Sequence, residues 1–100
     1  MKVSVLGCGR WGSFLAWYLA RIHAEVMIYG REGSATLVAL RRDRKNEYVT
    51  LPASVSFTTS LKEALDFAET VVISVGTQQL DGLAKSIASV EGHREKEYIL

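Results

Sequence analysis

The chain has 100 residues, of which 48% are hydrophobic and 23% are charged. This length predicts a single domain with a modest core. A formal net charge of +1 gives no electrostatic basis for binding nucleic acid or a membrane surface. No stretch reads as a membrane span or an export signal, and a single cysteine cannot form an internal disulfide. We therefore expect a protein of the reducing cytoplasm that is not inserted in a membrane.

The first part of the chain predicts a strand, a glycine-rich turn and a helix in direct succession. Lys2–Leu6 is apolar and rich in β-branched residues, as a buried strand should be. Gly7, Gly9 and Gly12 then form the pattern G-x-G-x-x-G. Residues 11–22 have helical periodicity, and the face expected to be buried consists of Phe14, Leu15, Tyr18, Leu19 and Ile22.

This order of elements is the context in which the glycine pattern binds a dinucleotide. Gly7 would allow the tight turn, Gly9 would let a pyrophosphate approach the backbone, and Gly12 would let the helix pack closely on the sheet. The free N–H groups and the positive end of the helix dipole would face the phosphates. The alternative is a glycine-rich turn that binds no ligand.

The middle of the chain continues the alternation. Glu25–Tyr29 predicts a second strand, and residues 34–44 predict a helix whose apolar side holds Leu37, Val38 and Leu40. Residues 46–54 contain the only proline and predict a loop.

The last part of the chain predicts two further helices and three strands. Ser60 and Glu63 have the spacing of a capping box, and Thr77 is a suitable N-cap for a helix whose apolar stripe is Leu80, Leu83, Ala84 and Ile87. The predicted elements are a strand at 55–58, a helix from Ser60 to about 68, a central strand at 70–75, a helix from Thr77 to about 90, and the start of a strand at 98–100.

Alternating strands and helices predict a Rossmann-like, doubly wound α/β fold with a parallel sheet. Right-handed crossovers give the strand order 3-2-1-4-5. Residues 1–100 would then form one dinucleotide-binding domain. Because the sequence stops as its fifth strand begins, we expect it to be a fragment of a longer polypeptide.

The end of the second strand distinguishes the two nicotinamide cofactors. Sites for NAD place an Asp or Glu there, which accepts a hydrogen bond from the ribose 2′-hydroxyl. Here Tyr29 and Gly30 hold that place and Arg31 follows. A guanidinium can bind a 2′-phosphate through two N–H groups, so Arg31 indicates NADP. Glu32 is the alternative ribose ligand, and its use would correspond to NAD.

Four other residues carry competing interpretations. Cys8 is a reactive thiol or, more simply, a small residue that fills the turn. Trp11 shelters the pyrophosphate or anchors the helix. His23 caps the helix that precedes it or acts in catalysis, and its place at the helix end favours capping. His93 lies in a polar segment and is expected to be exposed to solvent. No Cys/His cluster has metal-ligand spacing, and no Ser/His/Asp arrangement is present.

Five segments together resemble one enzyme family. Gly7-x-Gly9-x-Trp11-Gly12 is similar to the G-x-G-x-W-G of NAD(P)-dependent glycerol-3-phosphate dehydrogenases. Segments 26–31, 46–49, 59–64 and 75–78 match that family's pattern in order and spacing. Arg10 departs from the family's usual serine and Gly76 from its usual proline.

The resemblance implies an enzyme that transfers hydride between NADPH and dihydroxyacetone phosphate, giving glycerol 3-phosphate for phospholipid synthesis. It implies that Arg10, Trp11, Arg31 and Tyr48 contact the dinucleotide, although Arg10 could instead point to solvent. It also places the catalytic lysines after the fifth strand and in a helical C-terminal substrate domain, through which a homodimer could form. No catalytic residue is therefore assigned in this sequence. The alternatives are another two-domain reductase, such as a ketopantoate reductase, and a non-catalytic module that senses a dinucleotide.

Overall fold

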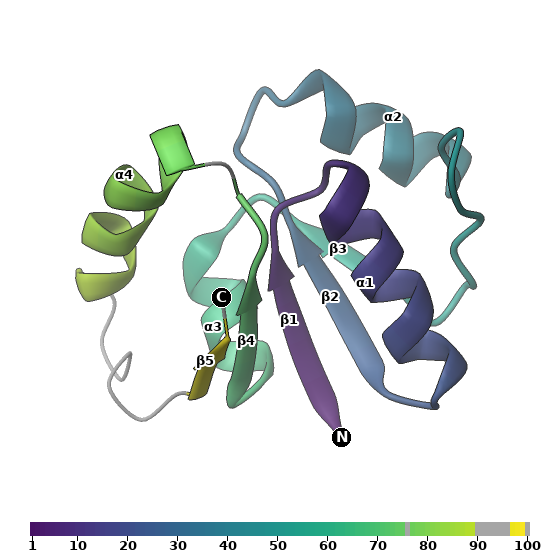
Figure 1. Cartoon of the computed structure of the whole chain (residues 1–100), viewed down its shortest axis with the longest axis horizontal. Helices are drawn as coiled ribbons and strands as arrows, with labels where there is room; N and C mark the ends of the chain where they lie inside the picture. Colours follow the sequence, from purple (N-terminus) through teal and green to yellow (C-terminus); the bar gives the residue numbers. More distant parts are fainter. Residues whose placement is uncertain (76, 90–96, 100) are drawn as a thin grey trace.

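The computed structural model describes residues 1–75, 77–89 and 97–99. Within these residues, strands and helices alternate from end to end (Figure 1). The elements are β1 (Lys2–Leu6), α1 (Arg10–Arg21), β2 (Glu25–Tyr29), α2 (Ala35–Asp43), β3 (Ser56–Thr58), α3 (Leu61–Phe67), β4 (Thr70–Ile73), α4 (Thr77–Ala88) and β5 (Glu97–Ile99).

The strands form one parallel sheet in the order β3-β2-β1-β4-β5, which confirms the predicted order. β1 lies at the centre, where Val3 pairs with Val26 of β2 on one side and with Thr70 of β4 on the other. Because all strands run the same way, their carboxyl ends meet at one edge. The glycine-rich turn leaves β1 at this edge (Figure 1).

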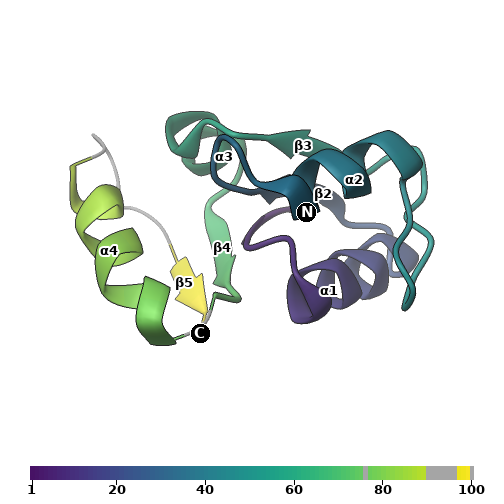
Figure 2. The ribbon, with the colours of Figure 1, turned by 90° about the horizontal axis from the view of Figure 1, so that it is seen from above.

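Two apolar clusters fill the space on either side of the sheet. One joins β1 and β2 to Ala16 of α1 and to Leu37 and Leu40 of α2. The other joins Leu6, Val71 and the apolar sides of α3 and α4. Figure 2 shows α1 and α3 on opposite sides of the sheet, as a doubly wound fold requires. In Figure 1, α2 lies beyond the carboxyl ends of β1 and β2, close to the glycine-rich turn.

The hydrophobic periodicity of α1 predicts its buried side only in part: Leu15 and Leu19 are partly buried, and Leu19 packs against the core, but neither is among the helix's fully buried residues. Its buried residues are the small ones, Gly12, Ser13 and Ala16. Phe14, Tyr18 and Ile22 are exposed, with Tyr18 keeping 52% of its surface accessible. A Cβ at Gly12 would lie 2.2 Å from the carbonyl oxygen of Gly7, so the start of the helix is too close to the backbone for large side chains. The large residues of α1 therefore lie at its flanks and on its outer face.

Two smaller packing predictions were also wrong, whereas the predicted cap at Ser60 is confirmed and Ser34 proves to be a second serine N-cap. Val38 of α2 and Ala84 of α4 are exposed, whereas the other described members of their stripes contact the core. The side chains of Ser34 and Ser60 accept hydrogen bonds from the third residue beyond each, Leu37 N–H and Glu63 N–H, both at 3.2 Å.

The remaining differences concern the ends of elements. The N–H of Ser60 donates to Thr58 Oγ1 at 3.0 Å, where a full capping box would use the Glu63 carboxylate. Thr77 belongs to α4 itself rather than preceding it. The predictions for the Leu80 side chain, Val90, His93 and Leu100 lie outside the described residues. No helix in the described ranges is both long and apolar enough to cross a membrane.

Candidate functional site

The glycine-rich turn is built by two glycines whose missing side chains make room for backbone. Gly7 has φ +132°, a conformation that side chains rarely adopt, and a Cβ there would lie 2.6 Å from the Ser74 carbonyl oxygen. Its N–H donates to the carbonyl oxygen of Tyr29 at 2.9 Å, which ties the turn to the end of β2. Gly12 lies against the carbonyl of Gly7. Both residues are therefore required by the fold of the turn.

Gly9 differs, because a Cβ at this position would have no heavy atom within 4 Å. It is the N-cap of α1, no side chain caps the helix there, and no acidic residue stands in the first turn. Its carbonyl oxygen is occupied by Ser13, which donates from its backbone N–H at 2.9 Å. The first N–H groups of α1 therefore have no capping side chain and no competing carboxylate in the first turn, an arrangement suited to an anion.

Arg10 and Tyr48 meet beside this turn although they lie far apart in the sequence. The Arg10 guanidinium carbon lies 4.9 Å from the centre of the Tyr48 ring, a cation–π contact. Tyr48 is half exposed and belongs to a tight turn in which Asn46 N–H donates to the Val49 carbonyl at 3.0 Å. The structure therefore brings together two of the residues that the sequence predicts at one site.

The end of β2 reaches the same edge of the sheet. Gly30 is buried, and a Cβ there would press on Leu37 of α2 and on Cys8 Sγ. Arg31 and Glu32 follow it, and both are exposed. Neither side chain makes a hydrogen bond or ion pair with another residue in the described ranges, although the Arg31 carbonyl oxygen accepts from Ser34 N–H at 3.0 Å. Both side chains are accordingly available to a ligand lying over the turn.

The structure decides between the competing interpretations of Trp11 and Cys8. Trp11 is 68% exposed and makes an edge-on contact with Phe14 of its own helix, at 6.2 Å between ring centres. It does not anchor α1 in the core. Cys8 is buried, and its sulfur lies 3.8 Å from Ser34 Oγ. It fills the turn, as the simpler interpretation expects.

Three polar side chains lie near the turn that the sequence did not predict as part of the site. Asn46 Nδ2 donates to Ser13 Oγ at 2.8 Å, and this bond joins the Tyr48 turn to α1. Ser74 Oγ is buried without a hydrogen-bond partner, near the positions that side chains at Gly7 and Gly12 would fill. Only the position of Ser13, four residues after Gly9, offered a sequence signal, since a helical serine can bond to the carbonyl one turn back.

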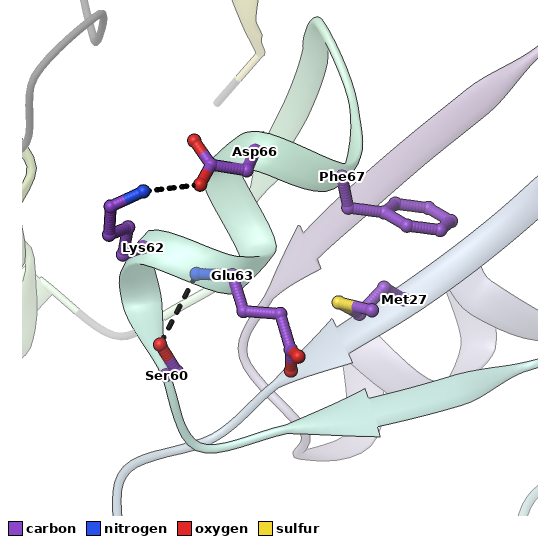
Figure 3. A pocket seen from close by; sticks show the side chains of 6 residues that line it. All are labelled: Met27, Ser60, Lys62, Glu63, Asp66 and Phe67. Carbon is purple, nitrogen blue, oxygen red and sulfur yellow. Dashed lines mark hydrogen bonds and ion pairs between the residues drawn. The ribbon is translucent and has the colours of Figure 1, made fainter.

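A hollow on the described surface lies away from this turn. It is open, has a volume of about 470 Å³, and is lined by β2 and α3 (Figure 3). Lys62 and Asp66 form an ion pair of 2.6 Å at its rim. None of the predicted site residues lines it. Across the residues that the structure describes, no group of His, Cys, Asp and Glu is placed to hold a metal ion.

Comparison with known proteins gives a consistent result. The family model described as the N-terminus of NAD-dependent glycerol-3-phosphate dehydrogenase matches residues 2–99. The glycerol-3-phosphate dehydrogenase (NAD(P)+) of Thermoanaerobacter sp. is 34% identical over 92 residues, and that of Bacillus pumilus 32% over 87. These alignments cover 90% and 84% of this chain but only 28% and 25% of the relatives.

A solved structure agrees in fold. The glycerol-3-phosphate dehydrogenase of Coxiella burnetii superposes with a TM-score of 0.77 at 20% identity, over 97% of this chain and 30% of that one. Identity at this level supports the fold alone. The family model matches nearly the whole length of the chain, and the sequence relatives agree with it. The chain therefore belongs to the NAD-dependent glycerol-3-phosphate dehydrogenase family and corresponds to its N-terminal region.

Proposed function

We propose that this chain binds a nicotinamide dinucleotide at the carboxyl edge of its sheet. The observation that carries the proposal is the open space at Gly9, which stands at the uncapped N-terminus of α1 and is followed by Arg10. A pyrophosphate fits there because it can accept from the first N–H groups of α1, while the helix dipole and the guanidinium offset its charge. Trp11 would shelter one side of the pyrophosphate, and Tyr48 would hold Arg10 on the other.

The exposed Arg31 favours NADPH over NADH. It lies two residues beyond Tyr29, whose carbonyl is bonded to Gly7, so it stands next to the turn. A guanidinium there can pair with a 2′-phosphate by charge-assisted hydrogen bonds. The position that would hold a ribose-binding carboxylate is Gly30, which is buried against Cys8 and Leu37. Glu32 is the group that would compete.

At a finer level, we propose that the chain supplies the cofactor-binding part of a cytoplasmic enzyme that reduces dihydroxyacetone phosphate to sn-glycerol 3-phosphate for phospholipid synthesis. The names of the curated relatives, glycerol-3-phosphate dehydrogenase (NAD(P)+), support the substrate class and the cofactor in this assignment. When bound, the reduced cofactor supplies hydride to the carbonyl carbon of the substrate. The residues described here bind and orient the dinucleotide, and none is assigned a proton-transfer role. A helical substrate domain, which could also mediate a homodimer, would provide the remaining groups.

Calorimetric titration of the chain with NADPH tests the proposal, with Gly9→Val as the variant. The valine side chain would occupy the space that the pyrophosphate needs, while its Cβ would meet no heavy atom of the described residues within 4 Å beyond the chain neighbours of Gly9. We expect the parent to bind and the folded variant to lose binding. Equal affinities in a variant with an unchanged unfolding curve would show that the turn does not receive the phosphates.

A further inference from the structure

Asn46 uses both the oxygen and the nitrogen of its side-chain amide, one within the turn that carries Tyr48 and the other toward α1. Its Oδ1 accepts the N–H of Tyr48 at 2.8 Å and of Val49 at 2.9 Å. Its Nδ2 donates to Ser13 Oγ at 2.8 Å. The orientation of the amide follows from these partners, because a reversed amide would set its NH₂ against two backbone N–H groups. One side chain thus shapes the turn and attaches it to α1.

Ser13 extends this connection to the glycine-rich turn. It is fully buried, and its hydroxyl donates to the Gly9 carbonyl at 2.8 Å, with Arg10 O a second acceptor at 3.1 Å. Since the hydroxyl proton is used in this way, its lone pairs are free to accept from Asn46. The hydrogen bonds run without a break from Gly9 through Ser13 and Asn46 to the backbone of Tyr48.

We infer that Asn46 and Ser13 are a positioning pair that holds Tyr48 under Arg10 and so preorganises the surface that receives the pyrophosphate. The inference rests on the proposed dinucleotide-binding function. The hairpin bonds between Lys45 and Thr50 and within the turn keep its shape, but they do not attach it to α1. Without the pair, Tyr48 and Arg10 must be ordered when the ligand binds, and this ordering lowers affinity.

The test is a double-mutant cycle with Asn46→Ala and Ser13→Ala, measured by NADPH titration. Ser13→Ala removes the hydrogen bond that joins the turn to α1, which predicts about threefold to tenfold weaker binding. Asn46→Ala also removes the bonds to the N–H groups of Tyr48 and Val49, so it should weaken binding at least as much. Because both changes break one connection, the double variant should bind no more weakly than the weaker single variant. Parent-like affinity in either single variant, or a double variant whose loss is the product of the two, would overturn the inference.

Ser86→Ala is the matched control. Ser86 Oγ also donates to a carbonyl one turn back, that of Gly82, at 3.1 Å, but it lies in α4 and is exposed. This variant should bind NADPH as the parent does. A comparable loss of affinity would mean that removing a helical serine hydroxyl has a general effect, which would contradict the inference.

Amide hydrogen exchange separates this inference from the proposed function. Exchange at Tyr48 and Val49 should become faster in both single variants, while the Glu63 amide, held by Ser60 Oγ, should be unchanged. If the parent binds no NADPH, the proposed function fails, and exchange alone decides whether the pair holds the turn. Unchanged exchange at Tyr48 in Ser13→Ala would overturn the inference, whatever the affinities are.

Discussion

Gly7, Gly9 and Gly12 belong to one motif for different physical reasons. Side chains at Gly7 and Gly12 would collide with the protein's own backbone, whereas one at Gly9 would enter open space. Gly7 and Gly12 are therefore needed for folding, whereas Gly9 leaves space in which a ligand could lie. We therefore expect a side chain at Gly9 to remove dinucleotide binding without altering the sheet.

Arg31→Ala should weaken NADPH binding far more than NADH binding. A charge-assisted hydrogen bond is worth roughly 1.5–3 kcal/mol, and an exposed contact should lie near the lower value, about tenfold in affinity. Titration with both cofactors at low and high salt measures this, and the loss for NADPH should shrink in high salt. Arg41→Ala removes an equally exposed arginine from α2 and should change neither affinity.

The opposite result for Arg31→Ala would mean that a different side chain contacts the ribose of the cofactor. If NADH binds more tightly from the start, or if both cofactors weaken equally, Arg31 does not contact the 2′-phosphate. Glu32 would then be the group that binds the ribose.

His23→Gly should stabilise the fold. His23 has φ 67°, and its N–H donates to Ala20 O while Ala24 N–H donates to Leu19 O, which is the Schellman pattern at the end of α1. It therefore caps the helix through its backbone, in a conformation that glycine adopts at lower cost. We expect a gain of about 0.5–1 kcal/mol in urea unfolding, after allowing for the greater unfolded-state entropy of glycine.

Arg44→Gly is the contrasting variant, because Arg44 also has a positive φ, 55°. Its side chain donates from Nη2 to the carbonyl oxygens of Pro52 and Val55, and glycine would remove these bonds. This variant should be less stable than the parent. Equal gains at both positions would mean that side-chain bonding does not matter at these helix ends.

At the scale of the element, α1 makes its contact with the sheet through small residues. Ala16→Leu should therefore destabilise the fold by about 1–3 kcal/mol, because the added atoms have no space at a fully buried position. Tyr18→Ala should change stability by no more than about 0.5 kcal/mol, since that side chain is on the outer face. Urea unfolding of both variants measures the difference, and the reverse order would mean that the hydrophobic stripe faces the core.

The same helix shows what hydrophobic periodicity can and cannot predict. The bounds of β1 and β2 and the parallel order of the sheet follow from β-branched runs and from alternating elements. The buried face of α1 does not, because it depends on how closely the helix approaches Gly7. Periodicity counts apolar residues and carries no information on that distance.

Some parts of the candidate site can likewise be predicted from the sequence, and one contact cannot. The glycine-rich turn and Arg31 have local signatures, so the sequence predicts where they lie. The bond between Asn46 and Ser13 joins residues 33 positions apart and has no local signature. It arises only when the hairpin folds back onto α1, and it could not be predicted before the fold was known.

At the scale of the whole molecule, the chain spans 28% of its Thermoanaerobacter relative. We expect the purified 100-residue chain to show no turnover of NADPH with dihydroxyacetone phosphate, because no side chain at the turn is assigned to protonate the carbonyl oxygen. Loss of NADPH absorbance measures this. Turnover by the parent but not by Gly9→Val would contradict the prediction, whereas equal rates in both would reveal a contaminating enzyme.

The exposed indole of Trp11 has an optical consequence. The molecule measures 32 × 28 × 19 Å, so a reduced nicotinamide ring bound to it is never far from Trp11 or from the half-buried Trp17. Indole emission overlaps the absorption band of that ring, and excitation can pass from one to the other. The bound ligand would therefore quench tryptophan fluorescence and emit in its place. A Trp11→Phe variant would separate the signals of the two tryptophans, so the chain carries its own reporter of occupancy.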